Sequence, residues 1–226
     1  MGLSAAAPPL VEQTVTRLRR DLLAGVHGPG VKLKVEHLSA RYGCSSSPLR
    51  EALNQLAHEG LVISGDRRGF RVASMSLEDF EDITRLRLLL DTQALKESIA
   101  LGTDEWEARS LAAFHRLQRV EARLPEGPVV LNDEWSALHK DFHMTLLSAT
   151  RSPRLKQTCS SLFDQAERYR RFSAMHRNEP RLKSREHEAI LHATVGRNTD
   201  KAVDLLVGHI CRTQDHVTEA IARLSL

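Results

Sequence analysis

The sequence has few cysteines. Its 226 residues include only Cys44, Cys159 and Cys211, which are far apart and form no CxxC pair. This excludes the disulfide framework of small secreted proteins and a CxxC-based zinc or redox site. The simplest interpretation is that the three are buried or partly buried thiols in a reducing cytoplasm.

Long hydrophobic runs are also missing. No stretch approaches the roughly 18 consecutive apolar residues that a membrane-spanning helix needs. The first nine residues are small and apolar, but they have neither a basic start nor a long apolar core. Residues 1–9 are therefore predicted to be a disordered tail rather than a signal peptide. We expect a cytoplasmic protein with no membrane partner.

The excess of charge of one sign is small. A formal net charge of +3 does not by itself imply a nucleic-acid partner. Its distribution is more informative: residues 1–74 contain ten Lys and Arg against six Asp and Glu, giving +4, whereas residues 75–226 contain 22 against 23, giving −1. The positive excess thus lies in the N-terminal third, where a DNA-binding region would need it.

A glycine turn, a serine run and a helical pattern follow one another from residue 43. Gly43 permits a sharp turn, Ser45 or Ser46 can cap the next helix, and Pro48 suits its first turn. Apolar residues then recur at helical spacing and should pack inward: Leu49, Ala52, Leu53 and Leu56. An amphipathic helix after a tight turn is typical of a helix-turn-helix.

The other face of this helix offers polar groups, namely Ser46, Ser47, Arg50 and Asn54. The first residues of a recognition helix approach base edges and phosphates. Arg50 can hydrogen-bond a guanine at two atoms. The serines from Ser45 to Ser47 can meet phosphates, helped by the helix N-terminus. The alternative is a capped surface helix with a solvated arginine.

The residues that follow favour DNA. A short apolar run at Leu61–Val62, a basic turn at Arg67–Gly69 and a second apolar run at Phe70–Val72 have the order of a β wing. Helix, turn, recognition helix and wing together are typical of a winged helix-turn-helix. Double-stranded DNA is therefore the predicted partner.

Residues 10–73 resemble the N-terminal domain of GntR-type bacterial transcription regulators. The resemblance is carried by Leu22–Gly25, Gly28–Gly30, Ser47–Leu53, Glu59–Val62 and Gly69–Val72. It implies DNA contacts from Arg50 and, at the tip of the wing, from Arg68 and Gly69. Two positions depart from the family pattern: Ser46 stands where many members carry an arginine, and Glu36 where a basic or polar contact residue is common.

A domain boundary is predicted near Ala73–Met75. Ser76–Asp79 is a capping-box pattern, and after it strand signals almost vanish. We expect helices at 76–101, 104–123, 128–150, 153–175, 180–196 and 199–224. The predicted fold is mainly α: a winged helix-turn-helix with a small β wing at residues 10–74, followed by an all-α bundle at residues 75–226.

Histidines in the second half have the spacing of metal ligands. His139 and His143 are one helical turn apart, so their rings project from one face, and His187 and His209 lie on the last two expected helices. Converging imidazoles would suit a divalent ion such as zinc or nickel. With 11 histidines in the chain, an i, i+4 pair can also arise by chance, and buried histidines that only pack and hydrogen-bond are the alternative.

Residues 76–220 resemble the FCD ligand-binding domain, which follows the DNA-binding domain in one branch of the GntR family. The resemblance is carried by Arg87 with Asp91, by Asp141–His143, Leu146, Ala149 and Pro153, by Glu186–Ile190, and by Ala202 with His209. Many such domains bind a metal through an aspartate, the Phe-His histidine and two histidines 22 residues apart, and 209 − 187 = 22.

The aspartate position of that pattern is His139. Either His139 is a fourth nitrogen ligand, or three histidines hold the site. Asp141 is two residues from His139 and from His143, so on a straight helix it points about 160° away from both. We prefer His139 as the ligand.

The resemblance implies small carboxylate or sugar-acid effectors. Arg87 could pair with such an acid, although it could instead pair with Asp91. We expect a homodimeric transcription regulator, a repressor rather than an activator, whose affinity for its operator is controlled by the effector.

Two other functions stay open. A metal-dependent hydrolase would need a glutamate beside the metal as general base. Glu186 and Glu188 flank His187 but are expected to point elsewhere on the helix. The other possibility is a helical dimerisation module in which the histidines only pack.

Overall fold

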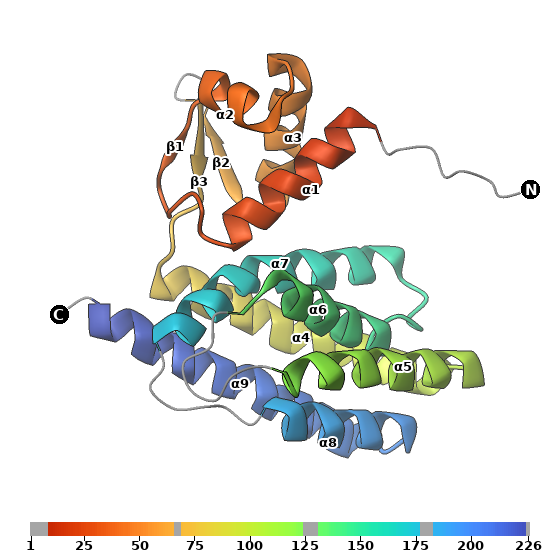
Figure 1. Cartoon of the computed structure of the whole chain (residues 1–226). Coiled ribbons are helices and arrows are strands. Elements are labelled where there is room, and N and C mark those ends of the chain that lie inside the picture. Colours follow the sequence, from red (N-terminus) through yellow and green to blue (C-terminus); the bar gives the residue numbers. More distant parts are fainter. Residues whose placement is uncertain (1–8, 66–68, 124–130, 177–182, 225–226) are drawn as a thin grey trace, which may run out of the picture. The chain divides into compact units, whose positions relative to one another are not determined.

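The computed structural model describes residues 9–65, 69–123, 131–176 and 183–224 (Figure 1). The chain divides into two compact units, Met1–Met75 and Ser76–Leu226. The expected disordered tail at residues 1–9 lies, except for Pro9, outside the described residues. No described helix is long and apolar enough to cross a membrane.

The first unit is a winged helix-turn-helix. Its order is α1 (Leu10–Leu23), β1 (Lys32–Leu33), α2 (Val35–Tyr42), α3 (Ser46–His58), β2 (Val62–Gly65) and β3 (Gly69–Val72). The strands form an antiparallel sheet in the order β1-β3-β2, in which Val62 pairs with Val72 and Gly65 with Gly69. The small β wing predicted from the sequence is therefore confirmed.

Local sequence explains the turn between α2 and α3. Gly43 ends α2 with a φ of 66°, a left-handed conformation that glycine adopts without steric strain. Helix α3 packs on α1 through an apolar face whose side chains are fully buried. The residues with no exposed surface in this core are Leu18, Leu49, Ala52, Leu53, Leu56 and Leu61. This core fixes which face of α3 remains at the surface.

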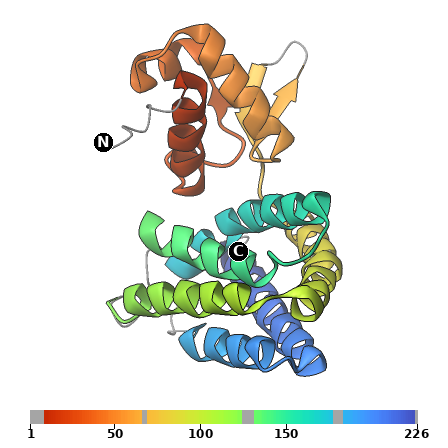
Figure 2. The same cartoon turned by 90° about the vertical axis from the view of Figure 1, so that its right-hand side faces the viewer.

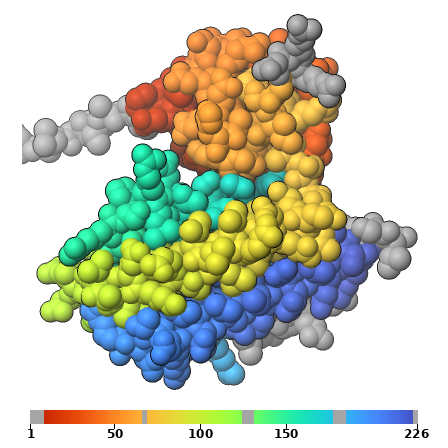
Figure 3. Space-filling model, turned by 180° about the vertical axis from the view of Figure 1, so that it is seen from behind, coloured from red at the N-terminus to blue at the C-terminus, as the bar shows by residue number. Residues whose placement is uncertain are grey.

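The second unit is helical throughout its described residues. Its helices are α4 (Leu77–Leu101), α5 (Asp104–Glu121), α6 (Asp133–Leu146), α7 (Pro153–His176), α8 (Lys183–Val195) and α9 (Thr199–Leu224). Helix α5 packs between α6 and α8 (Figure 2). Helices α4 and α9 lie side by side along one face (Figure 3). The expected all-α bundle is confirmed.

Capping residues set the starts of two of these helices. The Ser76 hydroxyl accepts a hydrogen bond from the Asp79 amide at 3.1 Å, as the capping-box pattern predicts. Asn132 accepts one from the Trp135 amide at 2.7 Å, so α6 begins at Asp133. The helix expected at 128–150 is therefore shorter than predicted, because Asn132 caps it and it ends at Leu146.

Candidate nucleic-acid interface and metal centre

Helix α3 presents a polar face to solvent. The exposed residues on this face are Ser46, Ser47, Arg50 and Asn54. The buried leucines lie on a different face of the same helix. Ser45 occupies the N-cap position with an extended backbone, but its side chain makes no capping hydrogen bond. The hydroxyls at the start of α3 are thus at the surface, where the backbone N–H groups of the helix end can also face an anion.

The wing is described in part. Gly69 is exposed and has a φ of +70°, which suits the tight return between β2 and β3. Arg68, the other residue expected at the wing tip, lies outside the described residues. Glu36 is exposed on α2.

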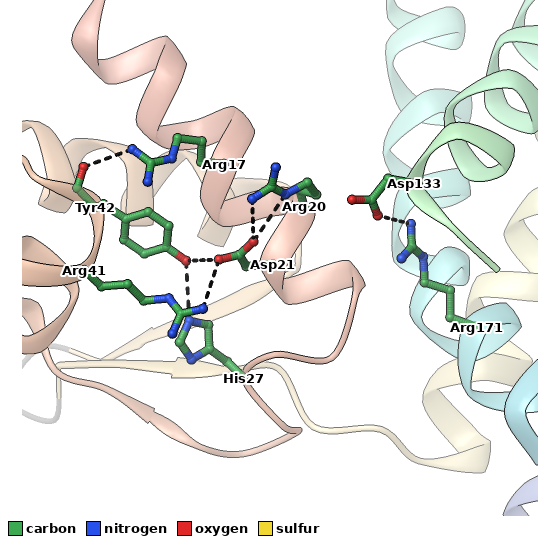
Figure 4. Close-up of polar contacts among 8 residues, drawn as sticks. All are labelled: Arg17, Arg20, Asp21, His27, Arg41, Tyr42, Asp133 and Arg171. Carbon is green, nitrogen blue, oxygen red and sulfur yellow. Dashed lines mark hydrogen bonds and ion pairs between the residues drawn. The ribbon is translucent and has the colours of Figure 1, made fainter. Parts of the chain in front are cut away.

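A polar network between α1 and α2 was not anticipated from the sequence. Asp21, on α1, accepts a hydrogen bond from the Tyr42 hydroxyl at 2.8 Å and from the Arg20 guanidinium at 3.2 Å (Figure 4). Arg41 lies 3.7 Å from the same carboxylate, and His27 Nε2 lies 3.5 Å from the Tyr42 oxygen. These contacts connect α1 to the end of α2.

Burial and charge pairing set the titration of this network. Burial raises the pKa of Asp21, but hydrogen bonds from Tyr42 and Arg20 outweigh it and hold the pKa below its ordinary value. Burial and the hydrogen bond to Asp21 raise the pKa of Tyr42 to about 12. The network therefore contains a carboxylate and a neutral phenol at neutral pH, which is the pairing that its geometry requires.

Four histidines meet in the interior of the helical unit. His139 and His143 come from α6, His187 from α8 and His209 from α9, and each is at most 5% exposed. One nitrogen from each ring lies within 4.8 Å of the others. The Nε2 atoms of His139 and His143 are 3.1 Å apart. The structure thus brings together all four histidines predicted as ligands.

The donor set fits a divalent transition metal. Burial, and then the nearby His209 and His187, lower the pKa of His143 well below its ordinary value. That ring is therefore neutral at neutral pH, the form in which imidazole binds a metal. Buried imidazole nitrogens suit zinc or nickel better than magnesium or calcium, which prefer oxygen.

Aromatic rings enclose the histidine cluster. The Trp135 ring stacks on His139 with centroids 4.3 Å apart and an angle of 22° between the planes. Phe163 lies 5.4 Å from the ring of His143, and Phe142 lies 5.4 Å from that of His187. An apolar wall of this kind excludes water and limits the ways in which the imidazoles can turn.

Other residues considered from the sequence have different surroundings. Arg87 is buried, and its Nη2 pairs with the Asp91 carboxylate at 2.9 Å, so the pairing weighed as an alternative is present. Its guanidinium lies 5.1 Å from the centre of Phe163. Asp141 lies at the surface, where it pairs with Arg116 at 2.7 Å, and takes no part in the cluster.

Glu186 corrects an expectation. From its position beside His187 on one helix it was expected to point elsewhere, but its carboxylate lies 2.7 Å from Nδ1 of His209 on the neighbouring α9. Sequence periodicity describes only the helix on which a residue lies, so it could not locate a partner on another helix. The carboxylate is thus engaged with a ring nitrogen of a proposed ligand and with Arg212, which is the position of an outer partner of the histidine.

Both halves of the chain match known families. Residues 10–72 match bacterial regulatory proteins of the gntR family, and residues 82–212 match the FCD domain. The chain is 38% identical over 201 residues to the HTH-type transcriptional regulator BphR of Paraburkholderia xenovorans (strain LB400), covering 89% of this chain and 82% of that protein. It is 34% identical to the HTH-type transcriptional repressor GlaR of Escherichia coli (strain K12), covering 91% and 94%.

The fold is also similar to that of a solved structure. The structure of E. coli McbR/YncC aligns with a TM-score of 0.76 at 18% identity, covering 96% of this chain and 100% of that one. The family and the relatives agree on a DNA-binding transcription regulator and not an enzyme. The chain belongs to the GntR family of bacterial transcription regulators, in the branch that carries an FCD domain.

Proposed function

We propose that this protein is a homodimeric, cytoplasmic repressor whose affinity for a DNA operator is controlled by a small carboxylate effector bound together with a divalent metal. The DNA-binding domain would span residues 10–74 and the effector domain residues 75–226. The observation that carries the proposal is the buried cluster of four histidines in a family whose members bind DNA. The name of GlaR as a repressor supports repression as the mode of control.

The proposed DNA contacts come from the exposed face of α3 and from the wing. Arg50 would read a guanine edge, because its guanidinium can donate two parallel hydrogen bonds. Ser45, Ser46 and Ser47 would hold phosphate near the helix N-terminus, and Asn54 would extend the contact along the groove. Arg68 and Gly69 are proposed to approach the backbone from the wing. The exposure of the described members of this set supports these roles.

The proposed effector site is built on the histidine cluster. His139, His143, His187 and His209 would hold zinc or nickel, and the ion would supply a Lewis acid to which a carboxylate can bind. Arg87 would then attract the acid electrostatically, since its guanidinium lies 5.1 Å from the centre of Phe163, a ring that lies 5.4 Å from that of His143. Its pairing with Asp91 means that an effector would have to share this guanidinium.

Dimer formation would connect effector binding to DNA binding. A dimer presents two copies of α3 at a fixed spacing, and only one spacing fits half-sites about one helical turn apart. An effector that favours one arrangement of the helical domains would therefore change operator affinity. Leu86 and Leu89 are exposed apolar residues on α4, 38% and 63% accessible, and they support a surface available for association.

The DNA-binding part is tested by titrating an operator fragment with Arg50→Ala. We expect a loss of about 1–3 kcal/mol, roughly 5- to 150-fold in affinity, with little change for unrelated DNA. Arg85→Ala is the matched control, because Arg85 is an exposed arginine in the helical unit that pairs with Asp82. Normal operator binding by Arg50→Ala would remove Arg50 from the assigned role.

The effector part is tested by measuring bound metal and thermal stability. Purified protein is expected to contain a divalent ion that His143→Ala loses, and small carboxylic acids should raise the melting temperature only before chelation. A helical module with merely packed histidines predicts no bound ion and no acid-dependent shift. That result would reject the effector site while leaving the operator titration unaffected.

A further inference from the structure

Two carboxylates lie just outside the histidine cluster, on the far side of two of its rings. Glu186 of α8 is 2.7 Å from Nδ1 of His209. Glu121, the last residue of α5, is 3.5 Å from Nδ1 of His187 and accepts a hydrogen bond from Trp135 Nε1 at 3.2 Å. Each carboxylate comes from a helix other than the one that carries its histidine.

The position of a carboxylate decides which ring nitrogen has the lone pair. A neutral imidazole holds one proton, and a carboxylate can only accept. With the proton on Nδ1 directed at Glu186, the lone pair of His209 is on Nε2. Glu121 is 3.5 Å from Nδ1 of His187, too long for a good hydrogen bond, so it contributes charge near that ring and does not set its tautomer. A histidine that binds a metal through one nitrogen commonly donates its other N–H to such an outer partner.

Charge gives these residues a second role. Four neutral imidazoles leave a bound divalent cation with its full charge in a buried site, and an uncompensated buried charge is unfavourable. Glu121 and Glu186 are acidic residues that contact histidines of the cluster. Glu186 is held on its other oxygen by Arg212 at 3.1 Å, one turn beyond His209 on α9. This clamp keeps the carboxylate directed at the ring.

We propose that Glu186 and Glu121 are outer-sphere residues of the metal site: Glu186 fixes the orientation and tautomer of His209, and both carboxylates offset the charge of the bound cation. The inference rests on the proposed metal function, and it adds two residues that contact no metal themselves. Glu186 is the stronger of the two, because its distance to the ring nitrogen is shorter and Arg212 restrains it.

The test measures cobalt(II) affinity by competition with a chelator, together with the nitrogen chemical shifts of His209 in metal-depleted protein. Glu186→Ala should weaken cobalt binding by about 10–100-fold. It should also move the His209 proton from Nδ1 toward Nε2. Glu186→Gln keeps an acceptor oxygen but no charge, so we expect it to retain the tautomer and to lose a smaller part of the affinity.

Glu188→Ala is the matched control. Glu188 is exposed on the same helix and lies 3.9 Å from His192, which is also exposed. Its removal should change neither cobalt affinity nor the His209 shifts. Glu121→Gln is expected to have a smaller effect than Glu186→Ala, in keeping with the longer contact to His187.

The outcomes separate this inference from the function on which it rests. Cobalt binding that is equal in Glu186→Ala and Glu188→Ala would overturn the inference and leave the metal site in place. A wild-type protein that takes up no cobalt would overturn the metal function and the inference with it. A His209 proton on Nε2 in the metal-depleted wild type would exclude Glu186 as the group that sets the tautomer.

Discussion

The two units hold their candidate functional side chains in opposite environments. Arg50 and its polar neighbours on α3 are exposed, whereas the four clustered histidines of the helical unit are at most 5% exposed. A DNA duplex is too large to enter a protein and has to be met at the surface. A metal ion is small, and its ligands bind best when neighbouring side chains restrict them and exclude water.

This difference predicts how function and stability are connected. On α3 the apolar face maintains the fold and the polar face is available for contacts, so one can be altered without the other. In the helical unit the same side chains fill the interior and form the site, so a change to the site also changes the packing.

The largest expected effect is a difference in stability between substitutions at two adjacent residues on α3. Leu53→Ala removes a side chain with no exposed surface and should lower the free energy of unfolding by roughly 2–5 kcal/mol. Asn54→Ala, at the next position but exposed, should change it by no more than about 0.5 kcal/mol. Chemical denaturation of the two variants measures the difference. Equal losses would mean that the two faces of α3 are not separable.

A metal ligand should give the next largest effect. Structural zinc sites with four ligands bind with about 10–16 kcal/mol, so losing His187 should weaken metal binding by roughly 2.5–4 kcal/mol. His192→Ala, which removes an exposed histidine from the same helix, is the control. Chelator competition compares the two. If His187→Ala matched the control, the cluster would be a packing feature only.

The network at Asp21 is a buried polar site in the DNA-binding unit. It tests whether buried polar groups affect stability in this unit as they are expected to do in the helical unit. Asp21→Asn should destabilise the protein at neutral pH by roughly 1–3 kcal/mol, because a charged acceptor is lost. The folded-state pKa of Asp21 lies below its ordinary value of 3.8. The stabilisation from the carboxylate is therefore complete above that value and is lost as the pH falls through the folded pKa.

Unfolding measured from pH 7 to pH 3 checks this sign. The wild type and Asp21→Asn should differ most at neutral pH and converge in acid. A difference that grew as the pH fell would contradict the assignment of a lowered pKa to Asp21.

The smallest change in stability is expected at Ser46. Ser46→Arg places a new guanidinium on the exposed face of α3, so the free energy of unfolding should move by no more than about 0.5 kcal/mol. The operator preference should change at the base pair that the new side chain reaches. Binding to a library of operator variants measures this. An unaltered preference would mean that residue 46 does not face the bases.

Local signals in the sequence were sufficient to predict two helix ends, the start of α4 and the end of α2. Ser76 starts α4 as its capping box predicts, and Gly43 ends α2. The start of α6 was predicted too early because Pro128 suits a first helical turn, whereas the helix begins at Asp133 after the N-cap Asn132. Both signals are present in the sequence, so local preference alone did not choose between the two starts.

Contacts between helices were the part of the site that the sequence could not supply. The spacing of His139 and His143 on one helix, and the family pattern for His187 and His209, placed the four rings in one set. Nothing in the spacing shows that Glu186 reaches across to His209 on α9. Such pairings depend on how neighbouring helices are rotated about their axes.

The stacking of Trp135 on His139 gives the protein a built-in optical label. The chain has two tryptophans, and both Trp106 and Trp135 are buried in the helical unit. Tryptophan fluorescence therefore observes that unit alone, and one of the two tryptophans is in contact with a proposed ligand ring. Events at the histidine cluster can be followed in the intact, unlabelled protein, even while its other unit is bound to DNA.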